Sequence, residues 1–318
     1  MRDAVQPSGV AQEEGDVTAF TRDQNRRRRT PAPRPARHRG ADEVENFSAS
    51  FTALGELAYR GARVAASVLD LGTGLPLLSI DDRIALPAAS VGKVLLLVEA
   101  SARITTRDFS GYGILDKTPA DAVADSGIWH RMQVPTLPVG DLGLLIGATS
   151  DNVATNVLLR QIGLDAVRAR AESLGLTRTA LLDRVRDRRG PDDAPQFSVG
   201  SAAELAWLFY ALSRGQIVDS VTSRRVLDWL SMNADLSMVA SAFGLDPLAH
   251  RTASHGVHLI NKTGTDTGVR ADVGLLHGPR AGVSYAVMVE FIDTSLQERL
   301  RVLDAMRMVG HDLLEYVH

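Results

Sequence analysis

The two ends of the chain carry the apolar spacing of helices and strands. Apolar side chains recur every three or four residues over 47–59, which predicts one face of a helix. β-Branched and small residues over 64–71 predict a strand, and a glycine-containing turn separates it from a second short strand at 77–80. The elements expected near the other end are strands at 257–263, 271–277 and 283–291 and a helix over 295–316.

The middle of the chain, about 90–250, has a helical period. The expected helices, separated by loops with glycine and proline, cover 90–104, 139–148, 151–162, 165–174, 201–213 and 220–232. Strands at both ends that flank a helical middle predict an α/β fold of the α+β type, in which an antiparallel sheet is built from both termini with flanking helices. An all-helical subdomain is inserted into it, with a cleft between the two. We expect the sheet subdomain at about 43–88 and 252–318 and the helical subdomain at about 89–251.

The first 42 residues lack this apolar pattern. Residues 1–40 hold nine arginines and five acidic residues, with Arg26–Arg29 in one block and several prolines after it. We therefore expect a disordered Arg/Pro-rich tail over 1–42, ahead of a domain over 43–318. The arginine block is compatible with nucleic acid or another anionic partner, but a solvated extension is the favoured interpretation.

Composition removes several classes of protein. The chain has 318 residues, of which 45% are hydrophobic and 23% charged, and a formal net charge of −3, a profile typical of globular proteins. The most apolar run, Val94–Val98, is too short to span a membrane. The absence of cysteine excludes disulfides, thiolate metal sites and a cysteine nucleophile. We expect a monomer with no metal and no cofactor.

The segment after the arginine block bears on location. It contains prolines but no apolar stretch, so the chain as written has no export signal and a cytoplasmic location is expected. An upstream start that encoded an apolar segment would instead place the protein outside the cytoplasm.

A serine and a lysine at the start of the first central helix form the first candidate for chemistry. Ser90 precedes Lys93 by three residues, so the hydroxyl and the amine share one helix face. The apolar run Val94–Val98 predicts a buried helix, and burial favours the neutral form of a lysine, which accepts a proton from a serine hydroxyl. Arginine cannot do this at any accessible pH.

The second motif is Ser150-Asp151-Asn152, at another predicted helix start. Either Ser150 or Asp151 suits the cap of that helix. The hydroxyl of Ser150 suits proton transfer to a leaving amine, and the Asn152 amide suits a contact with both Lys93 and a substrate carbonyl.

The third motif is Lys262-Thr263-Gly264, at the end of a predicted strand. Lys262 supplies a cation, Thr263 supplies a hydroxyl for an anionic group, and Gly264 lets a ligand lie against the strand edge. Lysine is rare, since Lys93, Lys117 and Lys262 are the only lysines among 35 basic residues. Two of the three therefore occupy positions where the chemistry requires a lysine.

In this order the three motifs resemble those of the class A β-lactamase and penicillin-binding serine hydrolase superfamily. The similarity runs from about Phe47 to the C-terminus, and the separation of Ser90 and Ser150 is typical of that family. The resemblance implies a β-lactamase-like fold, with Ser90 as the acylated nucleophile and Lys93 as its base or proton relay. It also implies an oxyanion hole formed by the backbone N–H groups of Ser90 and Thr265.

The same resemblance implies the substrate contacts. Lys262 with Thr263 would anchor a substrate carboxylate, helped by Arg270, and Trp129 would form an aromatic wall of the cleft. The expected substrate-binding set is Asn152, Lys262, Thr263, Gly264, Thr265, Trp129 and Arg270.

The chain departs from the family in the loop between the second and third motifs. Class A β-lactamases carry there a glutamate that activates the water for deacylation, and Arg186 occupies the matching position. An arginine is always protonated and cannot be a general base. Asp187 or a neighbouring aspartate takes the role only if the loop is shifted. We therefore expect a serine hydrolase whose Ser90 acyl-enzyme, formed with a β-lactam or a related carboxylate-bearing amide or ester, is released slowly.

Two other functions fit the same residues. One is a D,D-peptidase or esterase, for which the missing export signal is unfavourable because peptidoglycan lies outside the membrane. The other is a non-hydrolytic cytosolic protein that captures β-lactams covalently or binds a partner through the basic tail.

Overall fold

The computed structural model of the protein describes residues 47–251 and 256–318. The tail expected over 1–42 lies outside these residues, as does the beginning of the sheet segment expected from 252. Within them, the longer helices and strands predicted from apolar spacing are all present, with ends that differ from the predicted ones by at most three residues.

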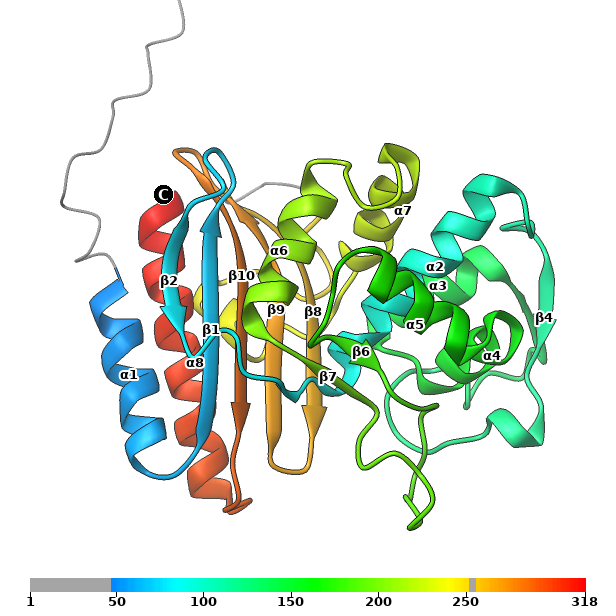
Figure 1. The fold of residues 1–318 in the computed structure, drawn as a ribbon, viewed down its shortest axis with the longest axis horizontal. Helices are drawn as coiled ribbons and strands as arrows, with labels where there is room; N and C mark the ends of the chain where they lie inside the picture. The colour runs from blue at the N-terminus through cyan, green and yellow to red at the C-terminus, as the bar shows by residue number, and fades with distance from the viewer. Residues whose placement is uncertain (1–46, 252–255) are drawn as a thin grey trace, which may run out of the picture. The chain divides into compact units, whose positions relative to one another are not determined.

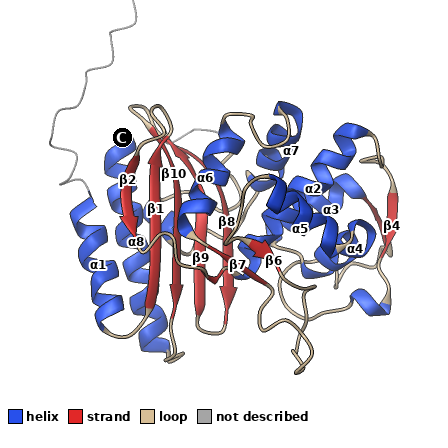
Figure 2. Cartoon of the chain, viewed as in Figure 1, coloured by secondary structure: helices blue, strands red, loops and turns tan. Residues whose placement is uncertain are grey.

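A five-stranded antiparallel sheet combines strands from both ends of the described chain (Figure 2). Its strands are β1 (Arg63–Asp70), β2 (Pro76–Ile80), β8 (His258–Asp266), β9 (Val269–His277) and β10 (Gly282–Glu290). The order is β2-β1-β10-β9-β8, so the N-terminal hairpin pairs with the last strand and β8 forms one edge. The predicted sheet from both termini is confirmed.

One face of the sheet is covered by α1 (Ser48–Tyr59), α8 (Leu296–Val317) and the short 3-10 helix η4 (Val239–Ala242) (Figure 1). Strand side chains alternate between the faces, so Val64 joins this layer while Ala65 joins the core on the opposite side. The sheet therefore separates two apolar cores.

The opposite face packs against α6 (Ala202–Ser213), whose backbone accepts a hydrogen bond from the hydroxyl of Ser284 in β10. This helix lies within the range that the sequence assigns to the helical subdomain. Its apolar side chains nevertheless cover the sheet, because Leu205 and Leu208 belong to the core that the sheet shares with the helices.

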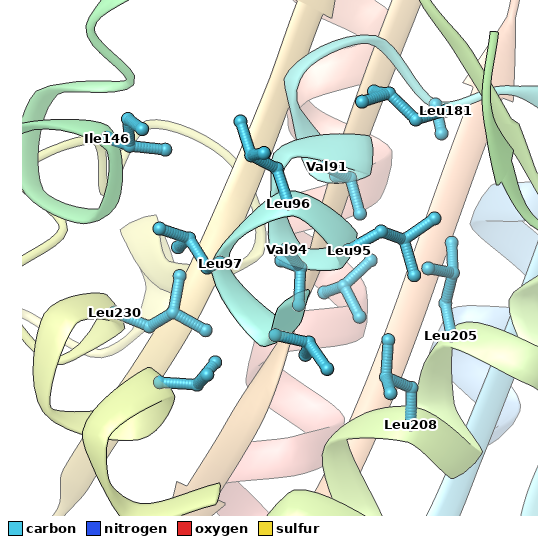
Figure 3. Packing of buried hydrophobic residues seen from close by; sticks show 14 of the residues in the cluster. Val91, Val94, Leu95, Leu96, Leu97, Ile146, Leu181, Leu205, Leu208 and Leu230 are labelled. Carbon is cyan, nitrogen blue, oxygen red and sulfur yellow. The ribbon is translucent and has the colours of Figure 1, made fainter. Parts of the chain in front are cut away.

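The helix α2 (Lys93–Thr106) runs through the centre of that core and is preceded by the 3-10 turn η2 (Ala89–Gly92). All its residues from Lys93 to Ala102 are buried, and leucines from several elements surround it (Figure 3). The helices around it are α3 (Val139–Thr149), α4 (Asn152–Ile162), α5 (Leu164–Ser173) and α7 (Ser220–Leu230). The predicted burial of this helix is confirmed.

Short elements complete the described part of the chain and are absent from the sequence prediction, because two or three residues leave no measurable period. They are β3 (Leu86–Pro87), β4 (Ile114–Asp116), η3 (Pro119–Asp121), β5 (Thr136–Pro138), β6 (Ala180–Leu181) and β7 (Ser198–Gly200). The pairing of β3 with β7 matters for the site, because it holds the entry to η2.

Candidate active site

Ser90 lies in η2, in the turn that leads into the buried helix α2. Contacts with Ser198 in β7 fix this turn: its hydroxyl donates to the Ala89 carbonyl oxygen at 2.6 Å, and its carbonyl accepts from the Ala88 N–H at 3.1 Å. Ala89 has a positive φ of 44°, a conformation that L-residues rarely adopt. The nucleophile candidate therefore stands on a constrained turn, half-buried, in the wall of a cleft of about 440 Å³.

Lys93 joins the first two motifs. Its ammonium nitrogen is fully buried and donates to the Ser150 carbonyl oxygen at 2.6 Å, to Ser150 Oγ at 3.1 Å and to Asn152 Oδ1 at 2.7 Å. Burial, and then the charge of Lys262, hold the pKa of Lys93 well below its usual value, while Asp151 opposes this. The predicted contact of Lys93 with Asn152 is present.

The hydrogen bonds of Lys93 suit a proton relay. In the ammonium form three N–H groups meet three acceptors. When the amine is neutral it keeps two N–H groups and gains a lone pair, so the hydroxyl of Ser150 becomes a donor to it. The lowered pKa of Lys93 favours this second form relative to an exposed lysine.

Asp151 caps helix α4 and fastens the loop in front of it. Its carboxylate accepts hydrogen bonds from the backbone N–H groups of Ala154 at 2.9 Å and of Ile128 and Trp129 at 2.8 Å each. Of the two caps that the sequence allows, Asp151 is the observed one, since Ser150 instead ends α3 with a φ of 55°. Asp151 thereby fixes both the helix that carries Asn152 and the loop behind the cleft.

The amide of Asn152 is committed on both sides. While Oδ1 accepts from Lys93, Nδ2 points at the carbonyl oxygens of Asp125 at 2.9 Å and Ala124 at 3.4 Å. The second expected role, a bond to a substrate carbonyl, therefore has no free N–H group in this arrangement. Asn152 instead ties the loop around residue 125 to Lys93.

The third motif runs along the edge strand β8. Lys262 is fully buried and donates to the Thr263 carbonyl oxygen at 2.7 Å. Burial lowers the pKa of Lys262 to about 8, although the carboxylates of Asp235 and Asp272 oppose the shift. Lys262 therefore stands behind the cleft wall, and its charge acts on the cleft from within the protein.

Gly264 explains why the strand can pass so close to the nucleophile. A Cβ atom at this position would lie 2.3 Å from the Ala88 carbonyl oxygen and 3.2 Å from the Ser90 backbone nitrogen. Only a residue without a side chain fits there. The close approach brings the third motif beside Ser90, and Thr263 and Thr265 line the same cleft.

A buried chain of polar side chains runs from Asn233 into the sheet, beside Lys262 in the sequence of β8. Asn233 donates to Asn261 Oδ1 at 2.8 Å, and Asn261 donates in turn to Asp272 Oδ1 at 2.9 Å. The hydroxyl of Tyr285 donates to the same oxygen at 3.1 Å. Burial raises the pKa of Asp272 to about 6. This chain places the loop that carries Asn233 against β8.

Two expected substrate contacts lie elsewhere. The indole of Trp129 is completely buried in the core and donates to the Val134 carbonyl oxygen at 3.0 Å, so the predicted aromatic wall is wrong. The guanidinium of Arg270 donates to the carbonyl oxygens of Asp266 and Val269 and lies 5.9 Å from the ring centre of Phe291. Arg270 is not among the described residues that line the cleft.

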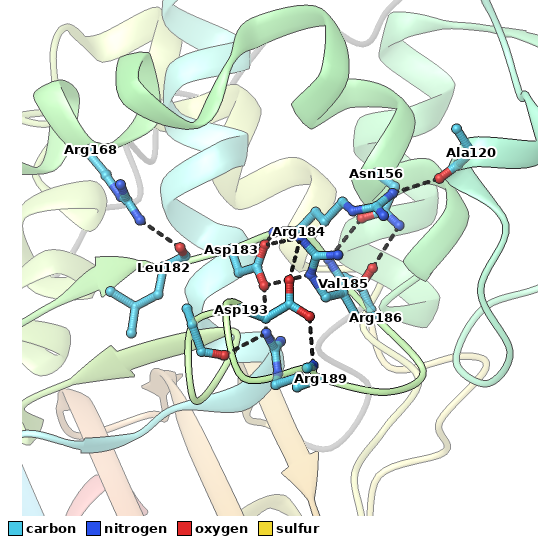
Figure 4. A network of polar contacts seen from close by, with 12 residues as sticks. Ala120, Asn156, Arg168, Leu182, Asp183, Arg184, Val185, Arg186, Arg189 and Asp193 are labelled. Atoms are coloured by element: carbon cyan, nitrogen blue, oxygen red, sulfur yellow. Dashed lines mark hydrogen bonds and ion pairs between the residues drawn. The ribbon is translucent and has the colours of Figure 1, made fainter.

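The loop over 182–197 is held by pairs of arginine and aspartate (Figure 4). Arg186 Nε donates to Asp183 Oδ2 at 2.7 Å, and Arg186 Nη2 lies 3.0 Å from Asp193 Oδ1. Arg189 Nη1 lies 2.7 Å from the same Asp183 oxygen. Arg186, at the position expected to activate water, thus serves the loop itself.

Asp187 does not take over the missing role in this arrangement. Its side chain is exposed, and Oδ1 accepts a hydrogen bond from the Ala124 N–H at 2.8 Å. Neither Asp187 nor Arg186 is among the described residues that line the cleft. Asp187 therefore fastens the 182–197 loop to the loop that Asn152 also holds.

Some of the residues that line the cleft belong to none of the three sequence motifs. The described lining consists of Ser90, Ser126, Ala148, Thr149, Ser150, Asn233, Ala234, Asp235, Thr263 and Thr265. Asn233 and Asp235 follow the end of α7, where no motif marks them. A larger cavity of about 630 Å³ lies between the ends of α2 and α7, but it contains none of the motif residues.

Within the described ranges, no group of histidine, aspartate and glutamate side chains is arranged to hold a metal ion. In the same part of the chain, no helix has both the length and the apolar character needed to cross a membrane.

Comparison with known proteins follows the same pattern. A model described as the β-lactamase enzyme family matches residues 46–317. A comparison with curated proteins finds no match. Among solved structures, a β-lactamase from Sphaerobacter thermophilus DSM 20745 is 23% identical with a TM-score of 0.74, over 85% of this chain and 97% of that one.

Two further solved structures are similar. A variant of the last common ancestor of Gram-negative bacteria class A β-lactamase is 25% identical, with a TM-score of 0.69 over 85% of this chain and all of that one. PBP-A is 18% identical, with a TM-score of 0.70 over 84% of this chain and 96% of that one. These similarities confirm the expected β-lactamase-like fold.

Proposed function

Because the chain belongs to the β-lactamase enzyme family, we propose that it is a serine hydrolase that forms an acyl-enzyme through Ser90. The acyl donor is a β-lactam or a related amide or ester that bears a carboxylate. The observation that carries the proposal is the buried amine of Lys93, held between Ser150 and Asn152 one helical turn from Ser90. A buried lysine whose pKa is lowered, placed beside the hydroxyl of Ser150, suits proton transfer.

Acylation follows from the placement of these groups. Ser90 Oγ attacks the carbonyl carbon while its proton passes to neutral Lys93. The C–N bond of a lactam then breaks, and Ser150 delivers a proton to the leaving nitrogen and regains one from Lys93. The backbone N–H groups of Ser90 and Thr265 suit the oxyanion, since β8 passes directly beside η2 at Gly264.

Release of the acyl group is the slow step in this proposal. Hydrolysis needs a base that activates water, and the loop over 182–197 offers Arg186 where the family has a glutamate. Its guanidinium is occupied by Asp183 and Asp193, and the carboxylate of Asp187 is held by a backbone N–H group. The acyl-enzyme is therefore long-lived, as in a penicillin-binding protein.

The similarity to PBP-A suggests a probe for this proposal. One of the similar solved structures is the L158E mutant of PBP-A as an acyl-enzyme complex with penicillin G, 19% identical with a TM-score of 0.69. That title concerns PBP-A. For the present chain it makes penicillin G a suitable probe.

The proposal is tested by mass spectrometry of the intact protein mixed with penicillin G, over minutes to hours. We expect a covalent adduct with the mass of the whole penicillin, because ring opening loses no atoms, that persists after free penicillin is removed. Ser90→Ala is the matched control and must show no adduct. An adduct that survives in Ser90→Ala, or no adduct with any β-lactam or aryl ester, contradicts the nucleophile; rapid turnover contradicts the slow release.

A further inference from the structure

The cleft around Ser90 carries an unexpected charge. Among the described residues that line it, Asp235 alone has an acidic or basic side chain. The two lysines of the motifs are fully buried behind the wall, and Arg270 is turned toward Phe291. A substrate that enters the cleft therefore meets one carboxylate and no exposed cation.

Asp235 is held in place by its own loop. Its Oδ1 accepts from the Ser237 hydroxyl at 2.6 Å and from the Ser237 N–H at 3.2 Å, and its carbonyl oxygen accepts from Asn233 at 3.1 Å. In the described part of the chain none of the ion pairs involves Asp235. Its carboxylate is thus held in position by hydrogen bonds and has no ion-pair partner among the described residues.

Asp235 lines the same cleft as Thr263 and Thr265, the residues beside which the third motif would anchor a substrate. Burial lowers the pKa values of Lys262 and Arg270, and the negative charge of Asp235 raises both. Asp235 therefore interacts electrostatically with both cations. A substrate carboxylate at Thr263 would be attracted by the cation of Lys262 but repelled by the carboxylate of Asp235. An ammonium group in the same place would be attracted.

We propose that Asp235 is a specificity-determining residue that selects acyl donors with an ammonium group on the leaving-group side and disfavours those with a carboxylate there. This inference rests on the proposed acylation of Ser90 and refines the substrate class of that site: carboxylate-bearing donors such as β-lactams still acylate Ser90, but donors with an ammonium group on the leaving-group side are preferred. The carboxylate of a β-lactam lies on the leaving-group side. β-Lactams therefore acylate Ser90 more slowly than they would without the negative charge of Asp235.

The test uses three phenylacetate esters of matched shape. Their phenols carry a meta carboxylate, a meta aminomethyl group or no charge, and kcat/KM is measured as phenol release with adduct formation followed by mass. Asp235→Asn is compared with Asp246→Asn, because Asp246 accepts from the backbone N–H two residues ahead as Asp235 does but lies exposed outside the cleft lining.

Each ester is its own reference, so differences in intrinsic reactivity cancel. We expect Asp235→Asn to raise kcat/KM for the carboxylate ester about tenfold and to lower it for the ammonium ester about tenfold, with the neutral ester changed less than about twofold. Asp246→Asn should leave all three unchanged. Equal changes for the three esters in Asp235→Asn would overturn the inference and leave the proposed function intact.

Failure of the proposed function has a different signature. If no ester acylates Ser90, the corresponding amides are titrated calorimetrically into Ser90→Ala and into Ser90→Ala with Asp235→Asn. A preference for the ammonium amide that is lost with Asp235 upholds the charge selection without acylation. Equal affinities for the three amides overturn it.

Discussion

The surroundings of Lys93 and the loop over 182–197 use charged side chains in opposite ways. Lys93 is fully buried with hydroxyl, amide and carbonyl oxygens as partners, and its charge has no carboxylate in contact. In the loop, by contrast, Arg186 and Arg189 both contact the carboxylate of Asp183. A buried charged group without an ion-pair partner has a shifted pKa, which suits proton transfer. A charged group in an ion pair instead stabilises the local structure.

This difference separates the two halves of an acyl-transfer cycle. The residues proposed to act in acylation meet around one cleft, while Arg186 in the loop over 182–197 is paired with Asp183 and Asp193. The predictions below change one region at a time.

Removal of the amine of Lys93 should give the largest effect. Lys93→Met keeps most of the side-chain volume and removes the proton acceptor, so the acylation rate with penicillin G should fall about 1000-fold. Lys117→Met is the matched control, because Lys117 donates only to the carbonyl oxygens of Trp129 and Met132. It should change the rate less than about threefold; similar losses in both variants would deny Lys93 a special role.

The pH dependence of stability should differ in sign between the buried carboxyl group of Asp272 in β9 and the carboxylate of Asp183 in the loop over 182–197. Burial raises the pKa of Asp272 to about 6 from 3.8, so the folded state holds a proton that the unfolded state loses, and stability falls between about pH 4 and pH 6 by about 3 kcal/mol. Urea unfolding of Asp272→Asn from pH 3 to pH 7 should lack this fall.

Asp183 is the matched carboxylate in the loop. Burial alone would raise its pKa, but hydrogen bonds from Arg186, Arg189 and the Arg184 N–H lower it overall. Its contribution to stability is therefore present above about pH 4 and is lost as the pH falls further. Asp183→Asn should reduce acid sensitivity below pH 4 and leave acylation within about twofold. The same pH profile in both variants would refute the contrast.

The smallest effect should be a fall in the acylation rate of a carboxylate-bearing ester at alkaline pH. Because burial lowers the pKa of Lys262 to about 8, its cation is lost as the pH rises through that value. The rate for the carboxylate-bearing aryl ester should fall about tenfold by pH 9 relative to that for the neutral ester. A ratio of the two rates that stays constant from pH 7 to pH 9 would show that Lys262 does not act on the substrate carboxylate.

The main elements of the fold were accessible from the sequence because periods of two and of three to four residues are local properties. The helix over 48–59, the buried helix after Ser90 and the strands at both ends appear close to their predicted positions. The burial of Lys93 was also predictable, since the apolar run that follows it leaves no polar helix face. The three motifs likewise identified the residues that meet around the cleft.

The tertiary structure decided what a side chain touches. The family resemblance implied that Trp129 is a cleft wall, yet its backbone N–H donates to Asp151 and its indole is buried. The side-chain amide of Asn152 has two N–H groups, and both point at carbonyl oxygens of the loop around residue 125.

The apolar periodicity, the rarity of lysine and the order of the three motifs can all be read along the chain. That Asp235 lines the cleft and that Arg186 contacts Asp183 and Asp193 follows from the folded structure alone. Electrostatic and hydrogen-bond energies depend on distances in three dimensions, and a linear pattern of residue types does not encode those distances.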